Sequence, residues 1–157
     1  MHQDVAVHNV LRFERPDGTT VPQTRSASLR STVSTETDPA GGTTLVADLS
    51  NVYYYNKTFV QHWTRRFEFR GDTLRVTDSC TVADGVRPVF QLHVPVEPVR
   101  LDNGTVVAGN LTVVPLQEGT VTWSAMPTPE YSKGYRLDFT SAAGCASSPP
   151  STPAPGC

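Results

Sequence analysis

Apolar and polar residues alternate along most of the chain with the two-residue period of β-strands, and no long window shows the 3.6-residue period of a helix. The clearest alternating segment is residues 59–69, where Trp63, Arg65, Phe67 and Phe69 share one face and polar side chains occupy the other. This pattern predicts a strand with one face turned towards a core.

The next segment predicts a hairpin partner for this strand. A two-residue turn at 71–72 leads into residues 73–82, where apolar positions again alternate. Asp78 falls in the apolar phase of that segment and is expected to lean inward. Because a buried carboxylate needs a partner, we expect a structural ion pair with Arg65 or Arg66 on the adjacent strand.

Shorter alternating segments, separated by turns rich in Gly, Asp and Pro, predict further strands. They are residues 5–13, 29–33, 43–48, 89–94, 105–108, 111–114, 120–124 and 135–139. Residues 49–57, which include three consecutive tyrosines, predict an irregular segment or one short helical turn. About ten short strands at this spacing predict an all-β fold, an antiparallel β-sandwich.

The end of the chain has a different composition. From residue 142 to residue 157, Ser, Pro, Ala and Gly dominate, and such a stretch cannot bury enough apolar surface to order itself. We therefore predict one β-sandwich domain over residues 5–141 and a flexible tail over 142–157.

Charge and hydropathy narrow the classes of partner. Only 18% of the residues are charged and the formal net charge is −2, so there is no basic surplus to neutralise nucleic-acid phosphates. No apolar run approaches the roughly 18 residues of a membrane span, and the first residues lack the pattern of a signal peptide. We expect no nucleic-acid or membrane partner, and a chain that either stays inside the cell or belongs to a longer secreted protein.

Three cysteines give weaker indications. Cys80 lies in an apolar strand, which predicts a small buried thiol. Cys145 and Cys157 flank the Ser/Pro-rich tail and could close a loop in an oxidising compartment. The odd count argues against a full disulfide framework.

The histidines and tyrosines are the first candidates for chemistry. No H-x-H, HExxH or CxxC spacing occurs, so no complete metal site can be read locally. The pair His8-Asn9 is compatible either with a half-buried polar pair at a sheet edge or with a metal ligand on a rigid strand. His93 has the pattern of an ordinary sheet histidine. Residues 53–55, all tyrosine, are compatible with a sugar-stacking platform or with core and rim positions.

Several short motifs occur in an ordered series. They are HNVLRF at 8–13 followed by DG at 17–18, ADLSNVY at 47–53, WTRRFEF at 63–69 followed by DTLRVTD at 72–78, and LH at 92–93. This series resembles the C-terminal β-sheet region of the heparinase II/III-like polysaccharide lyases, in patches over residues 7–139.

The resemblance implies a function and a fold. Members of that family carry an N-terminal α/α toroid followed by antiparallel β-sheets, and they cleave acidic polysaccharides by β-elimination. A base removes the C5 proton beside the uronate carboxyl and an acid protonates the leaving oxygen. Tyrosine and histidine side chains perform these steps in a cleft between the two domains, so one half of the cleft is insufficient.

This chain departs from the family pattern because it has neither the toroid nor the H-x-H strand that precedes the HN strand. We therefore expect a fragment that supports the substrate cleft and carries no catalytic residue of its own. His8 matches a ligand of the family's structural zinc site, whose remaining ligands would lie upstream of Met1. A structural zinc ion is thus expected in a full-length protein, and no cofactor in this chain alone.

By the same resemblance, four residues are candidates for substrate-side or inter-domain contacts: Tyr53, Arg65, Arg66 and His93. The planar fork of arginine suits the carboxylates or sulfates of a polyanionic sugar. The expected partners are an acidic polysaccharide and an α/α toroid domain or chain, in an extracellular or periplasmic setting. The alternative is a stand-alone carbohydrate-binding or structural β-sandwich module without catalysis.

Overall fold

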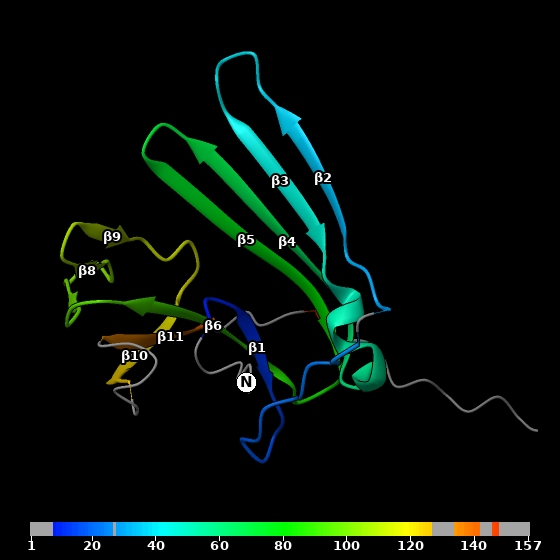
Figure 1. Cartoon of the computed structure of the whole chain (residues 1–157). Helices are drawn as coiled ribbons and strands as arrows, with labels where there is room; N and C mark the ends of the chain where they lie inside the picture. The colour runs from blue at the N-terminus through cyan, green and yellow to red at the C-terminus, as the bar shows by residue number, and fades with distance from the viewer. Residues whose placement is uncertain (1–7, 27, 127–133, 142–145, 148–157) are drawn as a thin grey trace, which may run out of the picture. The chain divides into compact units, whose positions relative to one another are not determined.

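The structure, a computed structural model, describes residues 8–26, 28–126, 134–141 and 146–147 (Figure 1). These residues form twelve β-strands and one short 3-10 helix, with every strand pair antiparallel except one. The predicted all-β class is confirmed. No helix in these stretches is long and apolar enough to cross a bilayer.

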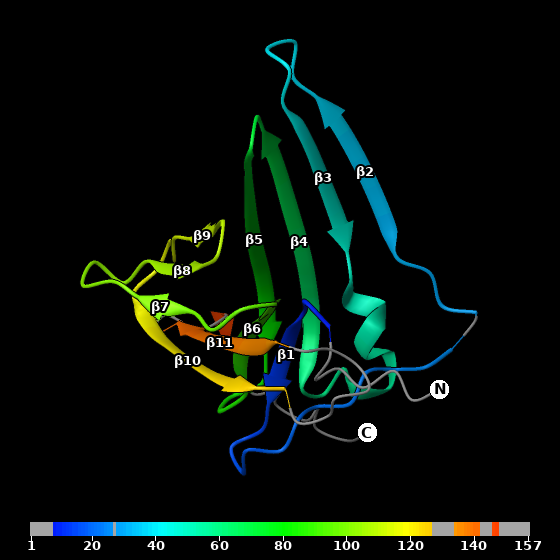
Figure 2. The same ribbon diagram turned by 60° about the vertical axis from the view of Figure 1, so that its left-hand side comes forward.

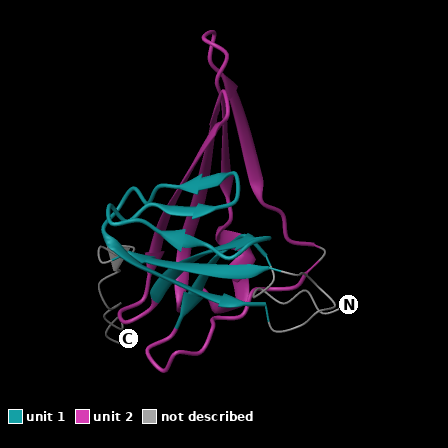
Figure 3. Cartoon of the chain, turned by 90° about the vertical axis from the view of Figure 1, so that its left-hand side faces the viewer, with its two compact units in different colours: residues 1–14, 87–144 teal, residues 15–86, 145–157 magenta. Residues whose placement is uncertain are grey.

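The chain divides into two compact units, drawn in teal and magenta in Figure 3. Unit 1 comprises residues 1–14 and 87–144, and unit 2 comprises residues 15–86 and 145–157. Unit 1 is therefore built from two separate stretches of chain, whereas nearly all of unit 2 comes from one.

Unit 1 contains two antiparallel sheets. The four-stranded sheet runs in the order β1 (Leu11–Glu14), β6 (Arg87–Val94), β11 (Tyr135–Ser141) and β10 (Gly119–Ala125). The three-stranded sheet runs in the order β7 (Val99–Arg100), β8 (Val106–Ala108) and β9 (Leu111–Val113). Their shared core contains buried Val94 and Leu137 from the first sheet and Val106 and Ala108 from the second. The two sheets pack as a sandwich, the architecture predicted for residues 5–141 as a whole.

Strand register separates the two faces of the four-stranded sheet. Leu137 is the partner of Leu92, and both belong to the apolar cluster. One residue further along β11, Asp138 is the partner of Gln91 in β6 and of Thr122 in β10. Because side chains alternate between faces, these polar residues lie opposite the apolar core.

Unit 2 contains one five-stranded sheet. Its order is β12 (Ala146–Ser147), β5 (Thr73–Val82), β4 (Val60–Arg70), β3 (Thr43–Asp48) and β2 (Thr32–Thr37). The 3-10 helix η2 (Ser50–Asn56) connects β3 to β4, as Figure 2 shows. Among the residues that the structure describes, the largest wholly buried side chain, Tyr53, comes from this helix.

The hairpin of unit 2 matches its prediction closely. β4 and β5 pair in register from Trp63 opposite Cys80 to Arg70 opposite Thr73. Gly71 opens the connecting turn with a φ of 57°, a backbone conformation that glycine adopts without steric cost.

The predictions for the shorter strands and for the C-terminal tail had different outcomes. Strand β2 begins and ends later than the predicted 29–33, because its exposed Thr- and Ser-rich sequence carries no clear apolar alternation. The two-residue strands β7 and β12 are too short for any period to predict. The predicted flexible tail lies outside the described residues apart from Ala146 and Ser147, which pair with β5 in parallel.

The expectation of a free thiol at Cys80 is wrong. The residue is buried, as predicted, but it is disulfide-bonded. The chain has only two other cysteines, so the partner is Cys145 or Cys157, and both lie outside the described residues. The apolar alternation of the strand indicates that Cys80 is buried, but it carries no information about a disulfide bond to a distant segment.

Candidate functional site

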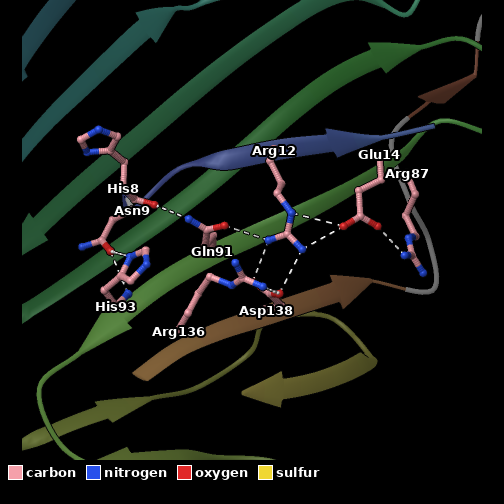
Figure 4. Close-up of polar contacts among 9 residues, drawn as sticks. All are labelled: His8, Asn9, Arg12, Glu14, Arg87, Gln91, His93, Arg136 and Asp138. Carbon is pink, nitrogen blue, oxygen red and sulfur yellow. Dashed lines mark hydrogen bonds and ion pairs between the residues drawn. The ribbon is translucent and has the colours of Figure 1, made fainter. Parts of the chain in front are cut away.

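Polar side chains on the four-stranded sheet of unit 1 form a network around Arg12, which Figure 4 shows in close-up. Arg12 is 9% exposed. Its terminal nitrogens donate to both carboxylate oxygens of Asp138, at 2.7 and 3.0 Å, and to Gln91 Oε1 at 2.9 Å. Glu14 Oε1 accepts from Nη2 at 2.8 Å and from Nε at 3.2 Å. All five N–H groups of the guanidinium are therefore used within the protein.

Two further arginines extend this network at its ends. Arg87 donates to Glu14, and Arg136 pairs with Asp138 at 3.2 Å. We call the six side chains the Arg12 network: Arg12, Glu14, Arg87, Gln91, Arg136 and Asp138.

Within this network, hydrogen bonds shift the pKa of Glu14 and the pKa of Arg12 in the directions that favour their charged forms. Burial alone would raise the pKa of Glu14, but hydrogen bonds from Arg87 and Arg12 outweigh it and lower that pKa below its ordinary value. Burial alone would lower the pKa of Arg12, but hydrogen bonds to Asp138 and Glu14 reverse the effect and raise it. The network therefore holds three guanidinium groups and two carboxylates in fixed positions, with one positive charge in excess.

A hollow of about 320 Å³ lies beside the Arg12 network, on the same face of the sheet. Its other walls include three threonines, Thr120 and Thr122 from β10 and Thr140 from β11. The hydroxyls of Thr120 and Thr140 are 2.8 Å apart and hydrogen-bonded to each other. We call this depression the threonine hollow.

The pair His8-Asn9 lies at the other end of the network. The main-chain carbonyl of His8 accepts a hydrogen bond of 2.8 Å from Gln91 Nε2. Asn9 Oδ1 accepts the main-chain N–H of His93 at 2.8 Å and lies 3.0 Å from His93 Nδ1. Because an amide oxygen can only accept, Nδ1 carries the proton in this contact. The pair therefore ties the start of β1 to β6.

The metal-ligand interpretation of His8 finds no support in its surroundings. The side chain is exposed, and the described part of the chain holds no group of three His, Cys, Asp or Glu side chains suited to a metal ion. The expectation of a structural zinc ion in a full-length protein, with its other ligands outside this chain, stays a prediction.

The expected ion pair of Asp78 is present in unit 2, with Arg65 as the partner. Arg65 Nε and Nη2 each donate to Asp78 at 2.8 Å, and Trp63 Nε1 donates to the same carboxylate at 2.7 Å. The guanidinium carbon also lies 5.5 Å from the Trp63 ring centre and 5.9 Å from that of Phe67. Arg65 is only 5% exposed, so its proposed role in contacting substrate does not fit the structure.

Tyr53 requires the same correction. Its side chain is 0% exposed, and its ring lies 6.1 Å from that of Trp63. Burial raises the pKa of Tyr53 to about 12, although a hydrogen bond with Gln23 opposes the shift. Sequence alternation cannot apply inside a 3-10 helix, so the buried tyrosine of the three could not be selected in advance.

The other two tyrosines are accessible. Tyr54 is 50% exposed and Tyr55 is 74% exposed, and their rings pack edge to face with centres 5.2 Å apart. Of the three tyrosines at 53–55, Tyr53 is therefore a core residue, whereas Tyr54 and Tyr55 form an exposed aromatic pair.

Arg66 lies on the polar face of the unit 2 hairpin. It pairs with Glu68 at 3.5 Å, and Arg75, the cross-strand neighbour of Glu68, lies 3.9 Å from the same carboxylate. Arg70 follows on the same face and pairs with Asp38 at 3.3 Å. Each of the three arginine side chains is 45% exposed or more. We call Arg66, Arg70 and Arg75 the arginine row.

The Arg12 network and the threonine hollow could not be identified from the sequence. The alternation of side chains along a strand places Arg12 and Glu14 on the same side of β1. It also places Thr120 and Thr122 on one side of β10, but it does not show that this side and the side of β11 that carries Thr140 face the same way. It could not indicate which strands become neighbours, and the network exists only through pairing between β1, β6 and β11.

At the level of class, the chain is an antiparallel all-β protein with two polar sheet faces. Comparisons with protein-family models, curated proteins and solved structures gave no match.

Proposed function

We propose that this chain is the C-terminal β-sandwich portion of a heparinase II/III-like polysaccharide lyase, which forms one wall of the cleft for an acidic polysaccharide. The observation that carries the proposal is the ordered series of motifs from HN at 8–9 to LH at 92–93. On this proposal, another domain or chain supplies the α/α toroid.

The roles of the matching residues support a resemblance at the level of the fold. Asn9 holds His93, and Arg65 holds Asp78, each through hydrogen bonds of 2.8 Å. Tyr53 fills the core of unit 2. Residues with such roles build a scaffold, and a scaffold is what a supporting portion of a lyase requires.

The same roles argue against independent catalysis. A general base must come within hydrogen-bond reach of the proton that it removes, directly or through one water. Tyr53 is wholly buried, and its raised pKa opposes the ionised form that would act as a base. We therefore propose that the isolated chain performs no elimination.

The arginine row supports contact with a polyanion. Its three side chains are exposed on one face of a rigid hairpin, and two nearby carboxylates, Glu68 and Asp38, offset only part of their charge. Attraction of this kind acts through solvent and is weakened by salt.

An elimination assay and a binding assay together test the proposal. Unsaturated uronate products absorb in the ultraviolet, and we expect no increase in absorbance when the purified chain is incubated with uronate polymers. In affinity electrophoresis through the same polymers, we expect retardation that decreases as salt increases. Arg66→Gln should reduce the retardation several-fold, whereas Lys57→Gln, which removes an exposed cation elsewhere in unit 2, should not.

Two results would contradict these expectations. Product formation by the isolated chain would show that it carries complete catalytic machinery. Equal retardation of the Arg66 and Lys57 variants would remove the arginine row as the substrate surface.

A second candidate function is a stand-alone carbohydrate-binding module, and the exposed pair Tyr54 and Tyr55 favours it. Aromatic rings of this kind offer apolar faces to sugar rings. Binding of neutral glycans that is lost in Tyr55→Ala and unaffected by Arg66→Gln would favour this candidate over the lyase portion.

A further inference from the structure

We propose that the threonine hollow of unit 1 is a binding site for an uncharged sugar, which it holds through hydroxyl hydrogen bonds. This proposal does not depend on the lyase interpretation. The hollow lies in a different unit from the arginine row. Its proposed ligand is uncharged, whereas the arginine row is proposed to contact a polyanion.

The volume and position of the hollow are the first argument. Its volume of about 320 Å³ is at the lower end of the range for ligand sites, which begins at about 300 Å³. Side chains from all four strands line it, so it crosses the polar face of the sheet and is not confined to a loop. Rigid sheet residues hold ligand contacts more accurately than loop residues do.

The charge balance of the hollow selects the ligand class. Two guanidinium groups, Arg12 and Arg87, and two carboxylates, Glu14 and Asp138, line it, so the formal charges of the lining groups cancel; Arg136, which pairs with Asp138, is not among them. The guanidinium groups disfavour a cation, and the carboxylates disfavour an anion. An uncharged polar ligand encounters neither penalty.

The saturated bonding of Arg12 sharpens this argument. Its five N–H groups already serve Glu14, Asp138 and Gln91, so Arg12 has no donor left for a carboxylate or phosphate ligand. It acts instead as a positioning residue that fixes the two carboxylates. A fixed carboxylate oxygen accepts a hydrogen bond readily from a sugar hydroxyl.

The remaining groups around the hollow match hydroxyls. Thr122 is exposed, and its side-chain hydroxyl makes no hydrogen bond to a described residue. Arg87 is 61% exposed and donates to Glu14, which leaves most of its N–H groups for a ligand. A sugar hydroxyl both donates and accepts, so neighbouring hydroxyls can bridge Thr122, Arg87 and a carboxylate.

Binding is expected to be weak. No aromatic ring lines the hollow, so the apolar stacking that strengthens many sugar sites is missing. We therefore expect a Kd on the order of 1 mM.

An NMR titration tests the site. A ¹⁵N-labelled chain would be titrated with cellotetraose, mannotetraose and galactotetraose, and in parallel with tetragalacturonate. At least one neutral oligomer should shift the amides of Thr120, Thr122, Asp138 and Thr140, and tetragalacturonate should not. Thr122→Val should weaken that binding at least about fivefold, which corresponds to about 1 kcal/mol, the contribution of one hydrogen bond. Thr112→Val, at an exposed threonine of β9 outside the hollow, should leave it unchanged.

Three results would overturn the proposal. The first is the absence of shifts at these amides with all three neutral oligomers. The second is binding of tetragalacturonate at the hollow as tight as that of the neutral sugars. The third is neutral-sugar binding that Thr122→Val leaves intact. The spectrum of each free variant shows beforehand whether its fold is retained.

Discussion

Each unit contains one buried arginine whose guanidinium is held by carboxylates. Arg12 in unit 1 is 9% exposed and Arg65 in unit 2 is 5% exposed. Arg12 joins strands that are distant in the sequence and uses all five of its N–H groups within the protein. Arg65 joins the two strands of one hairpin and donates two hydrogen bonds to Asp78. At the scale of the residue, the most buried charges therefore specify the fold and set the geometry of the groups around them.

Asp78→Ala should strongly destabilise unit 2, because it leaves the buried Arg65 without its carboxylate and Trp63 without its acceptor. Removing one partner of a buried pair costs about 3–5 kcal/mol. Glu68→Gln on the same hairpin, at an exposed pair with Arg66, should cost less than about 1 kcal/mol. Urea unfolding followed by circular dichroism measures both, and similar losses for the two variants would refute a structural role for the buried pair.

Alkaline pH should destabilise the chain through Tyr53. The folded state raises the pKa of this phenol to about 12, from an unfolded value of 10.0, so the native state retains its proton after the unfolded state has lost it. Stability should therefore be unaffected by Tyr53 below pH 10 and fall as pH rises from 10 to 12, by at most about 3 kcal/mol.

Tyr53→Phe provides the control for this pH dependence. It keeps the ring that packs on Trp63 but removes the titrating group, so its stability should decline less between pH 10 and 12. An equal decline in the variant would assign the alkaline sensitivity to other groups. Thermal unfolding midpoints at a series of pH values measure the difference.

At the scale of the element, predictability from sequence followed strand length and burial. The ten-residue and eleven-residue strands β5 and β4 contain several periods of alternation and were located to within about one residue. β2 is exposed along its whole length and was placed too early, because an edge strand of Thr and Ser carries no apolar phase. β7 and β12 hold two residues each, which is less than one period.

The polar contacts of the two units also differ in how far the sequence could predict them. The pair Arg65–Asp78 could be predicted because both residues belong to one hairpin, where a short turn fixes the register. The Arg12 network could not, because it depends on β1, β6 and β11, which are widely separated in the sequence. Of the substrate candidates, His93 and Arg66 are partly or largely accessible, whereas Tyr53 and Arg65 are used in the core.

The disulfide of Cys80 leads to a prediction about β12. Ala146 is the partner of Thr81 in the parallel pair, and the residues that precede these two in the sequence are Cys145 and Cys80. We therefore expect Cys145→Ser to abolish the disulfide and Cys157→Ser to preserve it. Peptide mapping without reduction reads the bond directly, and a bond that survives Cys145→Ser would assign the partner to Cys157.

The same bond should contribute to stability. A disulfide between distant positions restricts the unfolded chain, and its loss costs typically about 2–4 kcal/mol. Cys145→Ser should therefore lower the urea midpoint relative to Cys157→Ser. Disulfides persist in oxidising compartments, so this bond is compatible with the expected extracellular or periplasmic setting.

At the scale of the whole molecule, the two units differ in how the chain builds them. Nearly all of unit 2 is one continuous stretch, Arg15–Val86, whereas unit 1 joins residues 1–14 to residues 87–144. The antiparallel pair β1 and β6 therefore closes a loop that contains most of unit 2. The ends of that loop are already close when unit 2 is folded, since a Cβ on Gly85 would lie only 2.8 Å from Pro16 Cγ.

This connectivity predicts an asymmetric dependence between the units. When unit 2 is folded, the chain ends that carry β1 and β6 are already close, so pairing these strands loses little conformational entropy. When unit 2 is unfolded, the pairing must close a long flexible loop and loses much more entropy. Destabilising unit 2 should therefore also loosen the pairing of β1 with β6. Destabilising unit 1 leaves the continuous stretch of unit 2 able to hold its own pairing.

Hydrogen exchange measured by mass spectrometry separates the two cases, because it reports each strand in the same molecule. Asp78→Ala should increase exchange in β4 and β5 and also in β1 and β6. Arg12→Gln, which disrupts the Arg12 network, should increase exchange in β1, β6 and β11 while β4 and β5 keep their protection. If Asp78→Ala left the protection of β1 and β6 unchanged, the discontinuous unit would fold without the help of the continuous one.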